Sequence, residues 1–448
     1  MATTYISRTP SSGGNRRTWT FSAWVKRGTL GARQGIYNIN GGSNPYCYME
    51  FVASNAIRIE DYNGSTVTDL ITNRLFRDTS AWYHIVVAYD TTQSTNTNRI
   101  KLYINGVQET SFSTETYCAE DFDTEMNHTS GELFIGKEQS NYFDGLMSYV
   151  QLVDSAALAP TAFGSVDATT GEWKILASCY STPGTNGFCL GMEDSTNLDL
   201  DSSSNGHTFS TSGTLTATKD CPSDVFCNLN AVSPNNYTMT NGNTKIIGHT
   251  SSTTAVGTIC PNKGKWYWEV KLVSGQSSYP RIGIFQNDGS SNHIYTTHLC
   301  GSGDGSGRAW GSNSDASVAR YFAGDNSYVT GASYTNGSIV QFAMDLDNGK
   351  LWFGKDNTWY GSGAGTVTIA NIGNNTATPA FSDLGTGVNW TPAIFGNGSA
   401  DVWAANFGNG YFGTTAISSA GTNASGIGLF EFDVPTNFTA ISTKGLNA

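Results

Sequence analysis

Apolar and polar side chains alternate along many short segments of this 448-residue chain. In GKWYWEVKL, residues 264–272, Trp266 and Trp268 share one face of an extended strand with Val270 and Leu272. Successive side chains on a strand point to opposite faces, so this spacing puts both tryptophans on the same side. We therefore expect Trp266 and Trp268 to be core residues and not an open aromatic platform.

The same period of two recurs in other segments. WTFSAWVKR places Trp19 and Phe21 on one face, together with Ala23 and Val25. AWYHIVVAYD, residues 81–90, is apolar on both faces, as expected for a strand in the middle of a sandwich. His84 lies inside that segment, so we expect it to be a structural histidine whose ring nitrogens are satisfied by neighbouring groups.

Turn signals separate these segments. Asn105-Gly106 and Asn348-Gly349 are dipeptides that accept the positive φ values of a type I′ hairpin. The chain contains 51 glycines and only 13% charged residues, a composition that suits short strands joined by polar turns. No convincing amphipathic helix is visible. The sequence therefore predicts an all-β fold of two antiparallel jelly-roll β-sandwiches in tandem.

The strand pattern also predicts the domain organisation. One set of strands fills residues 1–160, and a second set fills residues 237–448. Residues 161–236 are expected to connect the two sets, with strands that complete one sandwich or bridge both.

Charge and hydropathy exclude two classes of partner. The net charge of −12, without any long run of Lys or Arg, argues against a nucleic-acid backbone. No window of the sequence approaches the length of a transmembrane helix, so membrane insertion is not expected. The first residues, MATTYISRTPSSGGNRRTW, have no apolar core of a signal peptide, which predicts synthesis in a cytoplasm.

The chain has eight cysteines, which permits four disulfides without requiring any. Cys179 and Cys189 flank a turn-rich stretch and are positioned to face each other across a hairpin. Cys221 and Cys227 enclose a five-residue loop and form a second candidate pair. The alternative is that these cysteines are reduced and act as small buried apolar residues.

Residues 1–160 resemble the concanavalin A-like jelly rolls of the laminin-G and pentraxin type. The resemblance is carried, in this order, by FSAWVKRG, WYHIVVAYD, RIKLYINGVQ and LFIGKEQSNYFDGLMSYVQLVD. Residues 240–415 resemble a SPRY domain through GKWYWEV, RIGIF, VQFAMDLDNGKLWFGKDN, WTPAIFGNG and VWAANFG. The order of the two parts resembles tail-fibre and virion-appendage proteins of marine bacteriophages.

Two kinds of site chemistry are weighed against a purely structural role. Some concanavalin A-like folds are glycosidases, which need two facing carboxylates, but no strand here carries an E-x-D-x-E pattern. In EDFDTEMNH the acids Asp121, Asp123 and Glu125 alternate, and loop oxygens at this spacing can hold Ca²⁺. The alternative is a solvated acidic loop. No cofactor is expected to be required, and Ca²⁺ is the one candidate.

A sugar is the best candidate ligand. In KDNTWYGSG, after a predicted hairpin, Asp356 and Asn357 precede Trp359 and Tyr360. Aromatic rings stack on the C–H faces of sugars, and Asn and Asp hydrogen-bond to sugar hydroxyls. These four residues form the candidate glycan site, with a packing role for the rings as the alternative.

The resemblance implies a non-enzymatic virion structural protein, most simply a tail-fibre or appendage protein that attaches to host-surface glycans. The alternatives are a capsid-decorating or head-fibre protein, and a secreted glycan-active enzyme of concanavalin A-like fold. The expected partners are other virion proteins and copies of the chain itself, in a trimer if it is a tail fibre. The expected location is the virion, on the outside of the particle.

Overall fold

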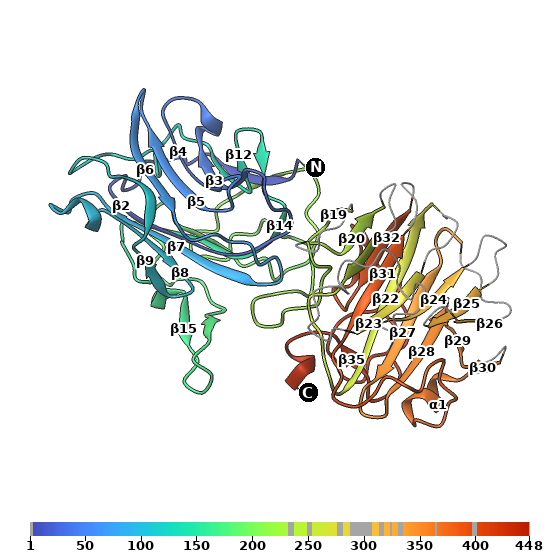
Figure 1. Cartoon of the computed structure of the whole chain (residues 1–448). Coiled ribbons are helices and arrows are strands. Elements are labelled where there is room, and N and C mark those ends of the chain that lie inside the picture. Colours follow the sequence, from blue (N-terminus) through green and yellow to red (C-terminus); the bar gives the residue numbers. More distant parts are fainter. Residues whose placement is uncertain are drawn as a thin grey trace. The chain divides into compact units, whose positions relative to one another are not determined.

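The computed structural model describes residues 3–231, 237–248, 253–275, 281–286, 307–312, 318–322, 325–329, 335–362, 365–396 and 401–447. The chain folds into two compact units, residues 1–217 and 218–448, each described here by itself. Both units consist of antiparallel sheets, which confirms the predicted all-β fold of two sandwiches in tandem (Figure 1).

The first unit packs a larger and a smaller sheet face to face (Figure 1). The strands of the larger sheet are, in spatial order, β10 (Phe112–Thr116), β6 (Thr66–Thr72), β5 (Ile57–Tyr62), β4 (Tyr46–Phe51), β3 (Gln34–Ile39), β11 (Leu133–Ile135), β1 (Tyr5–Arg8) and β18 (Ser210–Ser212). Those of the smaller sheet are β17 (Phe188–Leu190), β14 (Gly145–Asp154), β2 (Thr18–Arg27), β7 (Trp82–Asp90), β8 (Ile100–Ile104) and β9 (Val107–Glu109). The unit also contains the hairpins β12 (Lys137–Glu138) with β13 (Asn141–Tyr142) and β15 (Gly164–Val166) with β16 (Trp173–Ile175), and the 3₁₀ turns η1 (Asn40–Gly42), η2 (Asn96–Asn98) and η3 (Pro160–Ala162).

The period of two decides which side chains fill this sandwich. Trp19 and Phe21 of β2 are fully buried and meet Tyr37 of β3 across the core, with ring centroids 6.4 Å and 4.7 Å away. β7 is apolar on both faces, as predicted, because Val87 faces this core while Val86 packs on its other side against a second small cluster. Burial of these large side chains is the main source of the unit's stability.

His84 of β7 is enclosed on the outer face of the smaller sheet. One ring nitrogen, Nε2, lies 2.9 Å from the Ser22 hydroxyl, and the other, Nδ1, accepts a 2.9 Å hydrogen bond from the indole of Trp173. The ring also stacks on Trp24 at 4.7 Å between centroids. Trp173 belongs to the β15–β16 hairpin, so this hairpin closes over the histidine. The expectation of a satisfied structural histidine is confirmed.

The second unit is also built from two sheets with a core between them (Figure 1). The larger contains β19 (Thr238–Thr240), β20 (Lys245–Ile247), β32 (Val402–Asn406), β22 (Lys265–Ser274), β27 (Ile339–Asp345), β28 (Lys350–Lys355), β29 (Thr358–Tyr360) and β30 (Thr366–Val367), with β35 (Thr439–Ala440) beside β22. The other contains β21 (Thr253–Val256), β31 (Trp390–Gly396), β23 (Arg281–Gln286), β24 (Gly307–Ser312), β25 (Val318–Phe322) and β26 (Asp325–Val329). The remaining elements are the hairpin β33 (Tyr411–Phe412) with β34 (Thr415–Ala416), the short helix α1 (Ile369–Gly373) and η4 (Gly445–Asn447).

Strand β22 shows why its tryptophans are core residues. Trp266 and Trp268 are 3% and 0% exposed and lie in the main core of the second unit. The opposite face of β22 is covered too, because the C-terminal segment brings Phe430 against Tyr267 and Phe438 into the same cluster. The prediction of a tryptophan core is therefore confirmed, and Tyr267 and Glu269 on the second face are buried as well.

Glu269 fixes this covering segment to the sheet. Its buried carboxylate accepts hydrogen bonds from the backbone amides of Glu431 and Phe432, at 3.0 and 2.9 Å. It also accepts bonds from the Tyr267 hydroxyl at 2.9 Å and the Asn406 amide at 3.2 Å. Four donors converge on one side chain and offset part of the cost of burying its charge, and burial still raises the pKa of Glu269 to about 7.

The two predicted hairpin turns differ. Asn105 and Gly106 both have positive φ, 50° and 80°, as a type I′ turn requires. In the β27–β28 hairpin only Gly349 of the predicted pair has a positive φ, 65°, and four residues separate the strands. The Asp345 carboxylate accepts bonds from the amides of Asp347 and Asn348, which stabilises this longer loop.

The segment expected to connect the sandwiches is divided between them. Strands β17 and β18 complete the two sheets of the first unit, and residues from 218 onward belong to the second. Residues 232–236, where the expected segment ends, lie outside the described residues.

Candidate functional site

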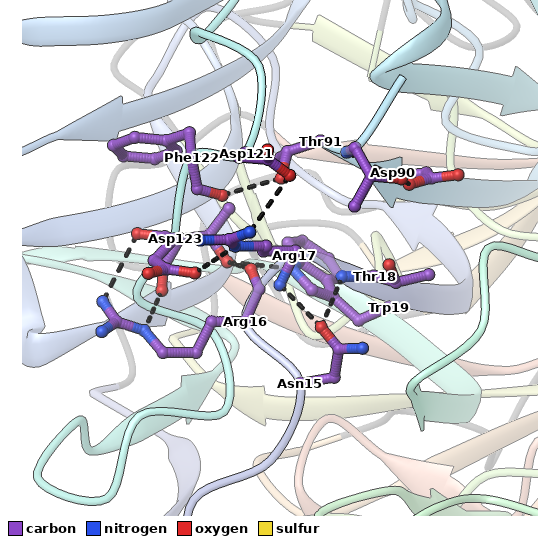
Figure 2. Close-up of polar contacts among 12 residues, drawn as sticks. Asn15, Arg16, Arg17, Thr18, Trp19, Asp90, Thr91, Asp121, Phe122 and Asp123 are labelled. Carbon is purple, nitrogen blue, oxygen red and sulfur yellow. Dashed lines mark hydrogen bonds and ion pairs between the residues drawn. The ribbon is translucent and has the colours of Figure 1, made fainter. Parts of the chain in front are cut away.

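The acidic loop that follows β10 is held by two arginines. Figure 2 shows Arg17 between two of the predicted calcium ligands, with Nη1 3.0 Å from an oxygen of Asp121 and Nε 2.7 Å from an oxygen of Asp123. Arg16 pairs with Glu125 at 2.7 Å. The hydrogen bond that Arg17 donates to the Asp123 carboxylate raises the pKa of the Arg17 guanidinium above its ordinary value. Each predicted ligand therefore has a cationic partner within the protein.

The loop backbone is fixed as firmly as its side chains. The Thr91 hydroxyl donates to the Phe122 carbonyl at 2.8 Å (Figure 2). The Thr124 hydroxyl donates to the Arg16 carbonyl at 2.6 Å. The indole of Trp19 donates to Thr124 at 2.9 Å, which ties the loop to the core. The acidic loop is thus held in place by both its backbone and its side chains.

These acids do not fit a calcium ion well. Ca²⁺ takes six to eight oxygen ligands, with carboxylates supplying the charge. Here the charges of Asp121, Asp123 and Glu125 are matched by guanidinium groups. Within the part of the chain that the structure describes, no group of three or more acidic, histidine or cysteine side chains suits a metal ion.

A hollow of about 400 Å³, which we call the Tyr62 hollow, lies between this loop and the larger sheet. Arg16, Phe122, Asp123 and Glu125 line one wall, and Asn44, Pro45, Tyr46, Tyr62 and Asn63 line the other. The second wall is formed where β4 begins and β5 ends. The volume lies within the range of small-molecule sites in proteins.

Three tyrosines form a stack beside the hollow. Tyr46 and Tyr62 are direct cross-strand partners, and their rings lie 5.0 Å apart at 10°. Tyr48, two residues further along β4 on the same face, stacks on Tyr46 at 5.6 Å and 16°. Tyr48 is buried, whereas Tyr46 and Tyr62 are half-buried at the hollow. The stack holds the rings of Tyr46 and Tyr62 in fixed orientations, and such preorganisation reduces the entropy cost of binding.

The carboxylates near the hollow are engaged by other groups. Asp61 contributes to the lining, but its side chain is buried, and its Oδ2 accepts a 2.9 Å bond from the Tyr89 hydroxyl in the core. Burial raises the pKa of Asp61 to about 6. Asp123 and Glu125 are bound to arginines. The hollow therefore presents polar groups fixed in place, an arrangement that suits binding.

The predicted glycan residues lie elsewhere, and the structure corrects their role. Trp359 and Tyr360 are 2% and 9% exposed and pack on opposite faces of β29, each into a separate core. Both faces of the sheet are covered here, so neither ring is available to stack on a sugar. Asp356 and Asn357 are exposed and form the positive-φ turn before β29, where the Asp356 carboxylate accepts a bond from the Ile339 amide.

One of the two candidate disulfides is formed. Cys179 is bonded to Cys189 of β17. The second expected bond is not present, because Cys221 is without a disulfide and its sulfur lies 3.3 Å from the Ser223 hydroxyl. Cys227 is instead buried in the main core of the second unit.

Sequence reasoning found only one wall of the hollow. Asp123 and Glu125 were identified as possible ligands, and the structure places both at its edge. Tyr46, Tyr62 and the two asparagines were missed. The available signal was in NPYCY and DYNGS, because Tyr46 and Tyr48 occupy the face of β4 opposite to Cys47 and Met49.

Solved structures with similarity to this chain are distant from it. The SPRY domain of human HERC1 has 14% identity and a TM-score of 0.28, covering 38% of this chain and 91% of its own. The TRIM65 PSpry domain has 14% identity and a TM-score of 0.28, covering 40% and 91%. Domain 4 of AbnA, a GH43 extracellular arabinanase from Geobacillus stearothermophilus in complex with arabinotriose, has 17% identity and a TM-score of 0.27, covering 35% and 69%. At these identities and TM-scores the similarities do not establish a fold or a function for this chain, and a SPRY-like second unit stays a prediction.

Two further findings concern the whole chain. No curated protein matches it. Across the described ranges, none of the helices combines the length and apolar character needed to span a bilayer.

The match to a protein family is confined to the first unit. The model of the concanavalin A-like lectin/glucanases superfamily matches residues 2–162, which include both walls of the Tyr62 hollow. The strand order and the antiparallel sandwich agree with that match. Residues 2–162 are thus similar to concanavalin A-like lectin/glucanase domains, and the match covers less than half of the chain.

Proposed function

We propose that this chain is a non-enzymatic bacteriophage virion protein, of the tail-fibre or appendage kind, that attaches to host-surface glycans through the Tyr62 hollow. The observation that carries the binding role is the hollow itself, in which stacked tyrosines stand opposite a wall of ion-paired side chains. Its presence in a domain of the lectin/glucanase superfamily supports a sugar as the ligand. The virion role rests on the resemblance in the order of the two parts.

The chemistry of the hollow matches that of a sugar. The Tyr62 ring offers an apolar surface for the C–H face of a pyranose, while Asn44 and Asn63 carry amides that both donate and accept hydrogen bonds. Arg16 and Glu125, fixed in an ion pair, add directional donors and acceptors for hydroxyl groups. In such sites a small number of polar groups at fixed positions orients the ligand and gives specificity.

A direct test is binding of the full chain to an array of bacterial surface polysaccharides and neutral oligosaccharides. Binding should be lowered at least about fivefold by Tyr62→Ala, because truncation of an aromatic anchor typically costs more than about 1 kcal/mol. Tyr62→Phe keeps the ring and should retain most of the affinity. Tyr411→Ala, which removes a half-buried tyrosine of the second unit, is the matched control. Equal loss in Tyr62→Ala and Tyr411→Ala, or no binding by any protein, would contradict the proposal.

The non-enzymatic role needs its own measurement. We expect no reducing sugar to be released when the full chain is incubated with a polysaccharide that it binds on the array. The reason is that Asp123 and Glu125 are held by arginines, which leaves no pair of free acids at the hollow among the described residues. Release above the buffer control that is abolished by Glu125→Gln would establish a glycan-active enzyme instead.

The assembly state is part of the same proposal. A single sugar site binds weakly, and several copies on one particle raise the overall affinity without new contacts. We therefore expect copies of the chain to associate, as a trimer in a tail fibre, alongside other virion proteins. Light scattering that shows only a monomer at high protein concentration would contradict this part.

A further inference from the structure

The chain contains ten Asn-Gly dipeptides, a pairing that is chemically labile. Their asparagines are Asn40, Asn63, Asn105, Asn186, Asn205, Asn241, Asn336, Asn348, Asn397 and Asn409, of which all but Asn397 lie within the described residues. Asparagine is a labile residue. It loses its amide most readily before glycine, which has no side chain to shield its own backbone nitrogen. Whether a given pair reacts depends on how firmly the fold holds the two groups.

Seven of the nine described asparagines are held by their side-chain amides. Asn105 Oδ1 accepts a 2.8 Å bond from the His84 amide, and Asn348 Nδ2 donates to Asp345 at 2.8 Å. Hydrogen bonds also hold the side chains of Asn40, Asn186, Asn205, Asn241 and Asn409. A side chain held in this way cannot turn its carbonyl carbon toward the following nitrogen without breaking that bond.

The other two pairs differ in the group that would attack. Asn63 and Asn336 are exposed, and their side chains make no hydrogen bond to any described residue. The Gly337 amide, however, donates a 2.7 Å bond to the Leu272 carbonyl, which occupies the nitrogen that would attack Asn336. The Gly64 amide has no such bond within the described part of the chain. Asn63-Gly64 is therefore the one described pair in which both reacting groups are free.

The turn between β5 and β6 explains why this pair is present. Residues 63–65 connect the two strands, and Gly64 has a φ of 106°, a value that residues with a side chain rarely adopt. The same turn places Asn63 in the wall of the Tyr62 hollow, next to Tyr62 itself. A reactive asparagine thus lies where the ligand is proposed to bind.

We propose that Asn63 is a site of spontaneous deamidation and that the reaction weakens sugar binding at the Tyr62 hollow. The Gly64 nitrogen attacks the side-chain carbonyl carbon of Asn63. A new C–N bond forms, the bond from that carbon to Nδ2 breaks, and ammonia leaves with the Gly64 proton. Water then opens the cyclic imide: cleavage at the side-chain carbonyl leaves an aspartate at position 63, and cleavage at the backbone carbonyl leaves an isoaspartate.

Both products change the hollow in the same direction. The Asn63 amide donates and accepts hydrogen bonds, whereas a carboxylate only accepts them. The new negative charge also adds to a lining that already contains Asp61, Asp123 and Glu125 with Arg16. A sugar hydroxyl loses its donor, so the affinity should fall by at least about threefold, the usual size of the effect for one hydrogen bond. This part of the inference rests on the proposed sugar-binding function.

The first test follows the modification by mass. The full chain is incubated for days at neutral and at mildly alkaline pH and digested with trypsin, which releases residues 59–74 as one peptide. Tandem mass spectrometry should show that position 63 exchanges NH₂ for OH before any other described Asn-Gly pair. The reaction should be faster at the higher pH, because the attacking nitrogen must lose its proton. If another described pair reacts first, or if position 63 keeps its amide, the inference is wrong.

The second test measures affinity for the sugar that binds best on the array, by isothermal titration calorimetry before and after incubation. The affinity of the wild type should fall as position 63 reacts, and Asn63→Asp should bind weakly from the start. Asn63→Gln, which would have to close a larger and less favourable ring, should keep the affinity that it has when fresh. Asn336→Asp adds the same charge at an exposed position of the second unit and should bind like fresh wild type. Thermal melting verifies that each variant is folded.

The outcomes separate the reactive site from the binding function. If position 63 reacts while the affinity stays constant, or if Asn63→Asp binds as tightly as the wild type, the effect on binding is refuted and the reactive site stands. If the fresh protein binds no sugar, the proposed function and the effect on binding fail together, whereas the reactive site is still judged by mass.

Discussion

Lowering the pH from 7 to 5 should destabilise the first unit through His84. This histidine is buried between Trp24 and Trp173, and burial lowers its pKa from 6.5 to about 3. Its Nδ1 accepts the proton of the Trp173 indole, so the neutral ring is the form that fits. Protonation of His84 would bury a positive charge. It would also place an N–H on Nδ1, which would then face the N–H of the Trp173 indole and break their hydrogen bond.

The sign and size follow from linkage. The unfolded chain binds a proton at His84 near pH 6.5, whereas the folded chain does so only near pH 3. The stability that comes from the neutral ring is therefore complete above pH 6.5 and is lost as the pH falls toward 3. Each pH unit in that window costs about 1.4 kcal/mol, so His84 contributes a loss of about 2 kcal/mol at pH 5.

The assay is urea unfolding of the wild type and of His84→Gln at pH 7 and pH 5, with the transition of the first unit fitted separately. Other groups also respond to pH. Asp61, whose pKa is raised to about 6, makes folding more favourable as the pH falls, but it is present in both proteins and cancels in the difference. The wild type should lose about 2 kcal/mol more than His84→Gln between the two pH values. Equal losses, or an NMR titration of the His84 ring near pH 6.5, would refute the reasoning.

Three further predictions follow from named side chains. Trp359→Ala should destabilise the second unit by about 3–5 kcal/mol in urea unfolding while leaving sugar affinity unchanged, because Trp359 fills a core. A variant that keeps its stability but loses sugar affinity would show that this ring binds the sugar. Glu269→Ala should cost about 3 kcal/mol, because four buried donors lose their acceptor, and a loss below about 0.5 kcal/mol would contradict the anchoring of the C-terminal segment. Calcium should not raise the melting temperature, because Asp121, Asp123 and Glu125 are all engaged in ion pairs with Arg16 or Arg17. A shift that grows with calcium concentration and is reversed by a chelator would show an ion site.

Local patterns of side chains predicted much of the fold. The alternation in β22 placed Trp266 and Trp268 in the core, and Asn105-Gly106 marked a tight turn, because both signals depend only on neighbouring residues. The covering of the second face of β22 was not predicted. Phe430 and Phe438 lie more than 150 residues further along the chain, and no local period shows that they will fold over Tyr267.

The same limit explains the errors at the sites. Trp359 was a candidate sugar-stacking ring with a packing role as the alternative, and the structure shows the packing role, because the sheet that contains β29 is covered on both faces. The Tyr62 hollow depends on the register that pairs Tyr46 with Tyr62, and on the arginines that hold the acidic loop from more than 100 residues away. Both are contacts between distant segments, which a single sequence does not specify.

The most direct measurement of the central claim is a crystal structure of the full chain with the sugar that binds most tightly on the array. We predict a sugar ring stacked on Tyr62, with hydroxyl groups bonded to Asn63. A sugar bound anywhere else on the chain, with the Tyr62 hollow vacant, would contradict the account.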